Sequence, residues 1–467
     1  MRMNTILYSL CLILLTVSLF AVNPRDMKFD ALNFKPEEPV RFTTDNGMIV
    51  YFYEDHQLPV MSATAYFNGG SVHDPDNKIG LSAITAAVMR SGGAGKRSPD
   101  QVDSDLDYVA ASVSIVASDE YFSGSVSSLI ADIDLGFEIF SDILISPSFD
   151  PEKLNLELAN TKERIRRRLD SPGDVTRWVY YRTVYQGHPY GSYPSLTTMD
   201  NITIDDVKNN HRRFFSPDNC IMAVSGDLTL EELKSKLRKY FSSWNKSGQK
   251  IPSAPHTSPE YRPGVYYAER DINQVHLRFG FQCLDSKNPD RYAMNIMNFA
   301  LGGGGFISRM TNRVRTTAGL AYSVGTYFYN RPLGGNLFGY CQTKAENMSE
   351  AAQMMLDIIE EVKSGGITEE ELNTARESIV NSFVFNYDTP DKVVSARALL
   401  ELQGFPPDHL EKGLKAYQKV TLKDCNRVAK KYLNTDIMVF VITGNKEMFD
   451  RPPDTFGPVT EASLDLN

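Results

Sequence analysis

The sequence has no surplus of positive charge. Its 467 residues carry 49 Lys and Arg against 58 Asp and Glu, a formal net charge of -9 at pH 7. The one dense basic stretch, residues 164–168, falls on a predicted helix, where a solvated basic face is the ordinary explanation. Because proteins that bind nucleic acid need a basic surface to neutralise phosphates, no nucleic-acid partner is expected.

Long apolar stretches are also scarce, and residues 6–20 form the only one. They follow Arg2 and are long enough for the core of a signal peptide, but short for a bilayer span of about 20 residues. Cleavage after Ala21 would make residues 1–21 a signal peptide and the mature protein exported, to the periplasm or another extracytoplasmic space. An uncleaved N-terminal anchor is the alternative, and it would be the chain's one contact with a membrane.

Cysteine is rare as well, with five in the chain, and Cys11 lies in the apolar stretch. The other four are far apart, without Cys-x-x-Cys spacing. An even number in an exported chain permits disulfides. Because Cys220, Cys283 and Cys341 fall in or beside apolar, strand-like segments, we predict buried free thiols instead.

Histidine is sparse and dispersed. The chain has seven, no two of them within five residues of each other: His56, His73, His188, His211, His256, His276 and His409. A helix that binds zinc through two histidines needs them four residues apart on one face, and no such pair is present. No Ser-His-Asp or Cys-His signature of nucleophilic catalysis takes its place.

The sequence does contain an internal repeat, at an offset of 218 residues. Residues 203–206 (Thr-Ile-Asp-Asp) correspond to residues 421–424 (Thr-Leu-Lys-Asp), and each set opens a helix with Thr as the N-cap. Each helix leads to a strand, at residues 221–224 and 439–442. The same offset relates Leu154-Asn155 to Leu372-Asn373 and Asp170-Ser171-Pro172 to Asp388-Thr389-Pro390.

The repeat predicts two homologous domains, at residues 40–245 and 263–450. A linker rich in Ser, Pro, Lys and Gly, residues 246–262, would join them. A chain of 467 residues is also too long for one ordinary core. In each half, strands joined by short turns alternate with long helices, which predicts an α+β fold with a mostly antiparallel sheet packed with helices.

A more specific pattern lies in the second half. Residues 302–305 are four glycines with no Lys-Ser/Thr after them, so we predict a flexible turn between helices rather than a phosphate loop. A helix is then expected to end at residues 315–317, followed by a turn and a strand that carries Tyr322. Arg315 and Tyr322 would lie at a helix end and a strand start, close enough to point into one cavity. From the residues alone, a helix-end cation and a half-buried strand aromatic are the favoured explanation of this pair.

The second half resembles the second domain of the pitrilysin/insulinase-type zinc metallopeptidase family. That domain has a Gly-rich turn, Ser-Arg-Leu, a helix ending in Arg, and then Gly-Leu-Ala-Tyr. Residues 308–310 read Ser-Arg-Met, a mild departure, and residues 319–322 read Gly-Leu-Ala-Tyr. The resemblance covers about residues 42–445 and includes Asn273-Gln274, His188-Pro189-Tyr190-Gly191, Pro217-Asp218-Asn219 and Gly226-Asp227.

The resemblance implies a fold and two site residues. The fold would be two homologous domains arranged as a bowl or half clam-shell. In the family the Arg donates to peptide carbonyls, and the Tyr donates to the scissile carbonyl as charge develops there. By this resemblance Arg315 and Tyr322 are expected to bind substrate.

The family's zinc motif, His-x-x-Glu-His, is absent from its expected place. Residues 83–87 read Ala-Ile-Thr-Ala-Ala, so Ala83 and Ala87 stand at the ligand positions and Ala86 at the base position. Alanine has no lone pair, so no bound metal and no catalytic residue are expected. Glu163, the nearest candidate for the family's third ligand, is expected to be a surface helix residue. His73 and Asp74, in the loop before the motif, are expected to form a solvated turn rather than an improvised site.

Some members of the family work as pairs, in which one subunit supplies zinc and base and the other keeps the Arg and Tyr. The resemblance therefore implies a non-catalytic, substrate-binding subunit of an exported heterodimeric zinc metallopeptidase, acting on peptides or unfolded segments. Zinc would be held only by a His-x-x-Glu-His partner, and this chain would have no cofactor and no activity alone. The segment near residues 111–122 corresponds to the strand that pairs with substrate backbone. The alternative is a family-derived binding or scaffolding protein, which need not keep the Arg and Tyr.

Overall fold

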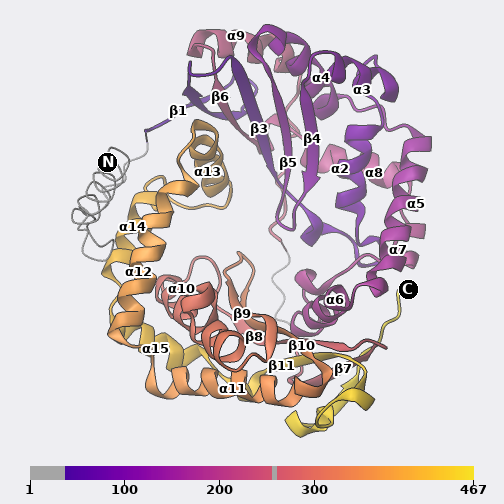
Figure 1. Ribbon diagram of the computed structural model, residues 1–467. Coiled ribbons are helices and arrows are strands. Elements are labelled where there is room, and N and C mark those ends of the chain that lie inside the picture. Colours follow the sequence, from indigo (N-terminus) through magenta and orange to yellow (C-terminus); the bar gives the residue numbers. More distant parts are fainter. Residues whose placement is uncertain (1–36, 255–259) are drawn as a thin grey trace, which may run out of the picture. The chain divides into compact units, whose positions relative to one another are not determined.

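The computed structural model describes residues 37–254 and 260–467, which form one compact unit (Figure 1). The predicted signal peptide at residues 1–21, and residues 255–259 of the predicted linker, lie outside the described residues. Within the described ranges, no helix is both long enough and apolar enough to cross a membrane. The four cysteines there are free thiols, three of them buried.

The first half contains one six-stranded sheet, in the order β1-β2-β6-β3-β5-β4. Neighbouring strands are antiparallel except β2 and β6, which run parallel. Their bounds are β1 Val40–Thr43, β2 Ile49–Glu54, β3 Val60–Asn68, β4 Ser112–Ala117, β5 Tyr121–Leu129 and β6 Cys220–Gly226. Every residue of the inner strand β6 is buried, which requires that both faces of the sheet be covered there.

The second half repeats this sheet, in the order β12-β7-β11-β8-β10-β9. Strands β7, β11, β8, β10 and β9 take the places of β2, β6, β3, β5 and β4. The bounds are β7 Gly264–Glu269, β8 Gln274–Cys283, β9 Ala321–Tyr329, β10 Gly335–Lys344, β11 Val439–Gly444 and β12 Val459–Glu461. The predicted α+β fold, with two mostly antiparallel sheets packed with helices, is therefore confirmed.

Each half covers its sheet with its own helices. In the first half α2 packs on β4 and α4 on β5, and α8 and α9 pack on these two helices. In the second half α10 packs on β9, α11 on β10, and α15 on both helices. The first-half helices are α2 Leu81–Ser91, α3 Pro99–Tyr108, α4 Ile133–Ile145, α5 Pro151–Arg167, α7 Leu196–Asp200, α8 Ile204–Phe214 and α9 Leu230–Phe241. Those of the second half are α10 Arg291–Asn298, α11 Met348–Gly365, α12 Glu369–Phe383, α14 His409–Lys419 and α15 Leu422–Tyr432.

The repeated helices α8 and α15 begin as the sequence predicts. Thr203 caps α8 by accepting from the backbone N–H of Asp206, and Thr421 caps α15 by accepting from that of Asp424. In both, the Asp side chain accepts from the Thr backbone N–H, which completes a capping box. The cap positions therefore fix the same helix start in both copies.

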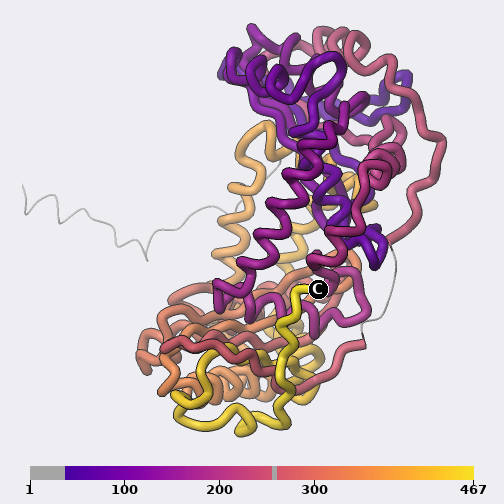
Figure 2. Tube along the Cα trace, turned by 90° about the vertical axis from the view of Figure 1, so that its right-hand side faces the viewer, coloured from indigo at the N-terminus to yellow at the C-terminus, as the bar shows by residue number. Residues whose placement is uncertain are grey.

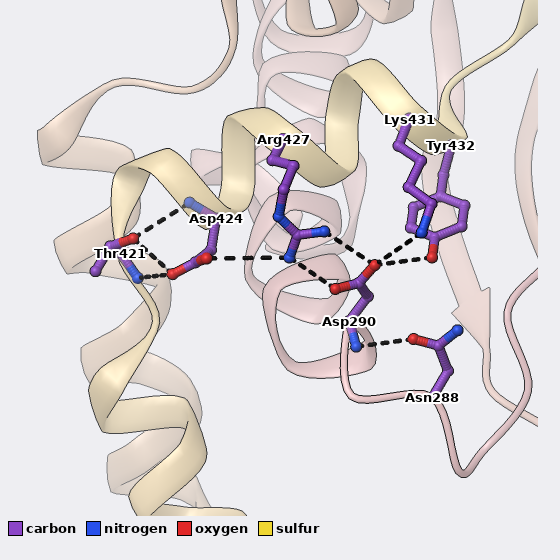
Figure 3. A network of polar contacts seen from close by, with 7 residues as sticks. All are labelled: Asn288, Asp290, Thr421, Asp424, Arg427, Lys431 and Tyr432. Carbon is purple, nitrogen blue, oxygen red and sulfur yellow. Dashed lines mark hydrogen bonds and ion pairs between the residues drawn. The ribbon is translucent and has the colours of Figure 1, made fainter.

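A charged network ties α15 to the start of α10 (Figure 3). Asp290, the N-cap residue of α10, accepts hydrogen bonds from Arg427 at 2.7 Å and from the Tyr432 hydroxyl at 2.8 Å, and it pairs with Lys431 at 3.3 Å. The hydrogen bond from Arg427 is the largest cause that holds the pKa of Asp290 well below its usual range. The network therefore favours the charged form of this carboxyl group.

The two halves exchange one helix each. Helix α6, Pro172–Val184, belongs to the first half but packs on β11 and β8 of the second sheet. Helix α13, Pro390–Leu402, belongs to the second half but packs on β6, β2 and β3 of the first sheet (Figure 1). Because Pro172 and Pro390 are 218 residues apart, the exchanged helices are equivalent members of the repeat.

The exchanged helices are well buried. On α13, Val394 and Ala398 are fully buried against Tyr51, Ile221 and Ala223 of the first sheet. On α6, Tyr180 is fully buried in a cluster shared with strands of the second sheet. These contacts cover the sheet faces that the helices of the same half leave open.

The C-terminal tail also joins the halves (Figure 2). Strand β12 lies parallel to β7 in the second sheet. Beyond it, Leu464 and Leu466 pack against the cluster around α6. The backbone N–H of Leu196, at the start of α7, donates to the Leu466 carbonyl at 2.9 Å.

Candidate functional site

Helix α2 carries the three alanines that stand at the expected zinc-motif positions. Ala83 is exposed and Ala87 half-buried, one turn apart, so the two ligand positions share the accessible face of the helix. Ala86, at the base position, is only 2% exposed. The helix therefore presents methyl groups where ligands would be needed.

The loop before α2 is a helix cap, not the solvated turn that the sequence suggested. Asp74 accepts from the backbone N–H of Gly80 at 2.8 Å, and from the backbone N–H and hydroxyl of Ser82 at 2.9 and 2.6 Å. Gly80 is the N-cap residue and has no side chain, so Asp74 satisfies the free N–H groups in its place. Burial raises the pKa of Asp74 to about 6 against the effect of these three donors.

The side chains near α2 do not fit a zinc ion. His73 is half-buried beside the Phe214 ring at 5.4 Å, and burial, then the Arg213 charge, lowers its pKa. Glu163 lies on the surface of α5 and pairs with Arg167 at 2.8 Å. Among residues 37–254 and 260–467, no three His, Cys, Asp or Glu side chains gather as a metal site would require. The family's zinc has no donor set in this part of the chain.

The four glycines of the second half end one helix and begin the turn that leads to the next. Gly302 and Gly303 belong to a π-helix, η8 Phe299–Gly303. A Cβ atom at Gly302 would lie 2.6 Å from the backbone nitrogen of Thr326 on β9. Glycine is needed at position 302 because the helix end lies against the strand, whereas residues 304–305 lie in the turn between this helix and the next helical segment, as predicted.

Arg315 and Tyr322 lie together, on elements whose geometry is unusual. Arg315 belongs to a second π-helical segment, η10 Thr311–Thr317. Such segments are rare in proteins, and those that occur are often found at functional sites. Its guanidinium carbon lies 5.6 Å from the centre of the Tyr322 ring and 4.9 Å from that of Phe306. The two residues that the sequence singled out therefore form one cluster, which Phe306 joins.

A β-bulge presents Tyr322 to solvent. In the pairing of β9 with β10, Gln342 lies opposite Ser323, and the next residue, Thr343, lies opposite Ala321. Tyr322 is thus the extra residue, and its side chain is 77% exposed. Bulges are common beside functional sites because they re-aim a single side chain.

Arg315 also differs from its neighbours in charge pairing. Arg309 makes two hydrogen bonds of 2.6 Å to the Glu371 carboxylate, and Arg313 pairs with Glu361 at 2.5 Å. Within the described part of the chain, Arg315 has no ion pair. Its donors are therefore available to a ligand.

The sequence did not single out the apolar side chains beside this cluster. Phe306 is 64% exposed and Ile307 is 62% exposed, although both are large and apolar. Their position directly after the glycine run was the only signal. With Arg315 and Tyr322 they form an exposed surface that combines apolar area, a cation and a phenol, which suits a peptide backbone with its side chains.

Strand β4 is the outermost strand of the first sheet on the side away from β1. It pairs with β5 along one edge, and among the described strands none pairs with its other edge. Ser112 and Ser114 on it are exposed. The segment that the resemblance associated with substrate backbone is thus an edge strand, and its Val113 carbonyl accepts from the Arg90 side chain at 2.8 Å.

Solved structures of peptidase-type proteins share this fold. The peptidase M16 inactive domain from Pseudomonas fluorescens superposes with a TM-score of 0.81 at 22% identity, over 89% of this chain and 100% of that one. The periplasmic protease PqqL from Escherichia coli superposes with a TM-score of 0.75 at 16% identity, over 91% of this chain and 48% of PqqL. These likenesses define the class of fold.

Family models identify the chain more closely. Residues 50–195 match the model of insulinase (peptidase family M16), and residues 201–379 match the model of the peptidase M16 inactive domain. The chain belongs to the insulinase family, peptidase family M16, and with its three alanines it is an inactive-type member.

Some curated relatives are named as proteases and another as a non-peptidase homolog. The uncharacterized zinc protease YmxG of Bacillus subtilis is 23% identical over 411 residues, which are 87% of this chain and 99% of the relative. The non-peptidase homolog YmxG of Helicobacter pylori is 23% identical over 404 residues, 85% of this chain and 92% of the relative.

Proposed function

We propose that this chain is the non-catalytic, substrate-binding subunit of an exported heterodimeric zinc metallopeptidase that acts on peptides or unfolded segments. The observation that carries the proposal is the Arg315–Tyr322 cluster, in which an unpaired guanidinium lies beside a phenol that a bulge exposes. The three alanines of α2 leave the chain without the groups that activate water. The alanines alone would mark the chain as an inactive relative. The Arg315–Tyr322 cluster suggests that such a chain still binds substrate.

The cluster can serve a peptide in two ways. The planar guanidinium of Arg315 can donate two parallel hydrogen bonds to backbone carbonyls, which fixes the register of an extended peptide. The Tyr322 hydroxyl can donate to the scissile carbonyl, where negative charge grows in the transition state. The zinc ion of a partner subunit would supply the activated water.

The size of a related protease supports a two-chain arrangement. PqqL contains this fold in only 48% of its length, so it has room for a second unit of similar size. We propose that a separate chain with His-x-x-Glu-His takes that part here, in the periplasm or another extracytoplasmic space. This chain would bind no zinc itself and would cleave nothing alone.

The test is an activity measurement on the complex. The chain is purified with the His-x-x-Glu-His protein that accompanies it, and cleavage of a quenched fluorescent peptide is followed. Arg315→Ala and Tyr322→Phe should each lower kcat/KM by about 100-fold or more, since the first removes the donors that hold the peptide in register and the second removes the donor to the scissile carbonyl in the transition state. Metal analysis should find one zinc per complex and none in this chain alone.

Arg313→Ala is the matched control, because Arg313 is on the same helix and pairs with Glu361. It should leave kcat/KM unchanged. Wild-type activity in both the Arg315→Ala and the Tyr322→Phe complex would rule out the substrate-binding role. If no peptidase accompanies the chain at all, the alternative of a binding or scaffolding protein is correct.

A further inference from the structure

Two cavities occupy equivalent places in the two halves. The first, of about 320 Å³, lies beside Trp178 and Arg182 of α6 and the segment that leads into α7. The second, of about 370 Å³, lies between α10, α13 and α14. Each cavity lies between an exchanged helix, α6 or α13, and the segment that follows that helix in the chain.

The lining residues show that the cavities are copies of one feature. Five positions recur at the offset of 218 residues, namely Trp178 and Ala396, Arg182 and Leu400, Gly191 and His409, Ser192 and Leu410, and Ser195 and Gly413. The duplication therefore reproduced the cavity along with the sheet and the helix, and its side chains then diverged.

The chain's own tail forms one wall of the first cavity. Asp465, Leu466 and Asn467 line it. The Leu466 side chain packs into the apolar clusters on either side, and its carbonyl accepts from the Leu196 N–H. Two guanidiniums, of Arg168 and Arg182, stack on the Trp178 ring at 5.1 and 4.7 Å. Burial lowers the pKa of Arg182, and the charge of the Asp465 carboxylate acts against that shift. The segment that occupies the first cavity is thus the chain's own tail, in which a carboxylate directly precedes a leucine.

The second cavity has the matching chemistry without such a segment. The described residues that line it all lie between Ser286 and Tyr417. Its one full charge is the guanidinium of Arg291, which is 9% exposed and stacks on Tyr292 and Phe405. The partners of that guanidinium are the Ser286 carbonyl, the Tyr292 hydroxyl and the His409 ring, all of them neutral acceptors.

Among the residues that the structure describes, no carboxylate forms an ion pair with this buried cation. Asp and Glu are absent from the described lining, and Glu411, on the same helix as His409, is already paired with Arg397 at 2.5 Å. Two further polar atoms of the lining, Ser286 Oγ and Asn330 Oδ1, are buried with no hydrogen-bond partner in the described structure. Buried polar atoms of this kind are normally satisfied, so the cavity is built for a ligand with both a negative charge and hydrogen-bonding groups.

We propose that the cavity around Arg291 binds an extended peptide segment of a second polypeptide, one that carries a carboxylate beside a large aliphatic side chain. The carboxylate pairs with Arg291, the aliphatic group fills the apolar side near Leu400 and Leu410, and the peptide backbone satisfies Ser286 and Asn330. The segment comes from another chain because this chain's own tail of that chemistry is held in the first cavity. The site is separate from the Arg315–Tyr322 cluster and does not depend on the function proposed for it.

The test uses a probe of known sequence, a synthetic peptide identical to residues 460–467 with a fluorophore on its amino end. Fluorescence anisotropy with the full chain should show saturable binding at one site. Arg291→Gln should weaken binding by at least about tenfold, as should a peptide with Asn in place of Asp465, since each removes one charge of a buried pair.

A second variant blocks the cavity without removing a polar group. A Cβ atom at Gly413 would meet only Tyr292, at 3.7 Å, so Gly413→Leu extends into the cavity. It should abolish binding while the thermal unfolding midpoint stays near that of the wild type. Arg182→Gln, in the first cavity, is the matched control and should bind the probe as the wild type does.

Three results would overturn the proposal. They are an absence of saturable binding to the wild type, equal affinity for wild type, Arg291→Gln and Gly413→Leu, and loss of binding in Arg182→Gln alone, which would place the probe in the first cavity.

Discussion

At the scale of the residue, Asp74 makes the stability of the fold depend on pH. Burial raises its pKa to about 6, compared with about 3.9 in an unfolded chain. Its contribution to stability is therefore complete below about pH 4 and is lost as the pH rises through about 6. We expect Asp74→Asn, which is uncharged throughout, to gain about 3 kcal/mol relative to the wild type between about pH 4 and pH 8. Urea unfolding at a series of pH values measures this.

Asp100→Asn serves as the control, because the Asp100 side chain is 97% exposed. Its stability profile should run parallel to that of the wild type. A parallel profile for Asp74→Asn as well would mean that the Asp74 carboxylate is not perturbed by its surroundings.

A pair of buried tyrosines gives a second prediction at this scale. The Tyr180 hydroxyl is buried without a hydrogen-bond partner among the described residues. The Tyr267 hydroxyl has two acceptors for its proton, the Glu269 carboxylate and the Gly444 carbonyl, and it accepts from the Lys446 N–H at 3.0 Å. Tyr180→Phe should therefore change the free energy of unfolding by less than about 1 kcal/mol, or raise it. Tyr267→Phe should cost about 1–2 kcal/mol. Denaturant unfolding of both variants is the measurement, and an equal cost would contradict the assignment of partners.

At the scale of the element, the contact of α10 with α15 depends on Asp290. Replacing it by Asn leaves Arg427 and Lys431 without their carboxylate, and we expect a loss of about 1–3 kcal/mol at pH 7. Because the folded pKa of Asp290 is depressed, its contribution is present above about pH 4 and is lost as the pH falls. The stabilities of variant and wild type should therefore converge in acid, as calorimetry at several pH values would show.

Glu361→Gln is the control for this network, since the Glu361–Arg313 pair is about half exposed on both sides. It should cost at most about 1 kcal/mol. Equal stability of Asp290→Asn and wild type at pH 7 would mean that the network contributes nothing to the packing of the two helices.

The elements also show what could be predicted from the sequence. The caps at Thr203 and Thr421 are local patterns, so they gave the helix starts and, through their constant spacing, the duplication. The bulge at Tyr322 and the π-turn at Arg315 depend on how the strand and helix pair with their neighbours, and no local pattern contains that information. Asp74 was missed because its capping partners, Gly80 and Ser82, are six and eight residues away, beyond the usual capping distance.

At the scale of the whole molecule, the exchange of α6 and α13 should make the two halves unfold together. The chain has two tryptophans, of which Trp244 lies in the first core and Trp178 on α6 near the second sheet. We expect Trp178→Phe and Trp244→Phe, each with one remaining tryptophan, to report the same unfolding midpoint. Val394→Ala, on α13, should destabilise by about 2 kcal/mol and shift both midpoints equally. Two separate midpoints would show that the halves are independent.

The exchange of α6 and α13 between the halves could not be predicted from the sequence. An apolar helix face shows that a helix is covered, but not by which of two similar sheets, because both offer the same kind of surface. The resemblance to a family supplied the Arg315 and Tyr322 hypothesis, whereas the residues alone favoured a helix-end cation and a half-buried strand aromatic. The domain boundaries at residues 245 and 263 stay a prediction.

The exchange of helices has a consequence for the order in which the protein is made. The first sheet is complete in sequence once Gly226 leaves the ribosome, yet α13 begins about 160 residues later. At synthesis rates of about 5–20 residues per second, Tyr51 and Ile221 remain uncovered for roughly 10–30 s. During that time the nascent chain presents an apolar sheet face that only a chaperone, or its own unfinished second half, can shield.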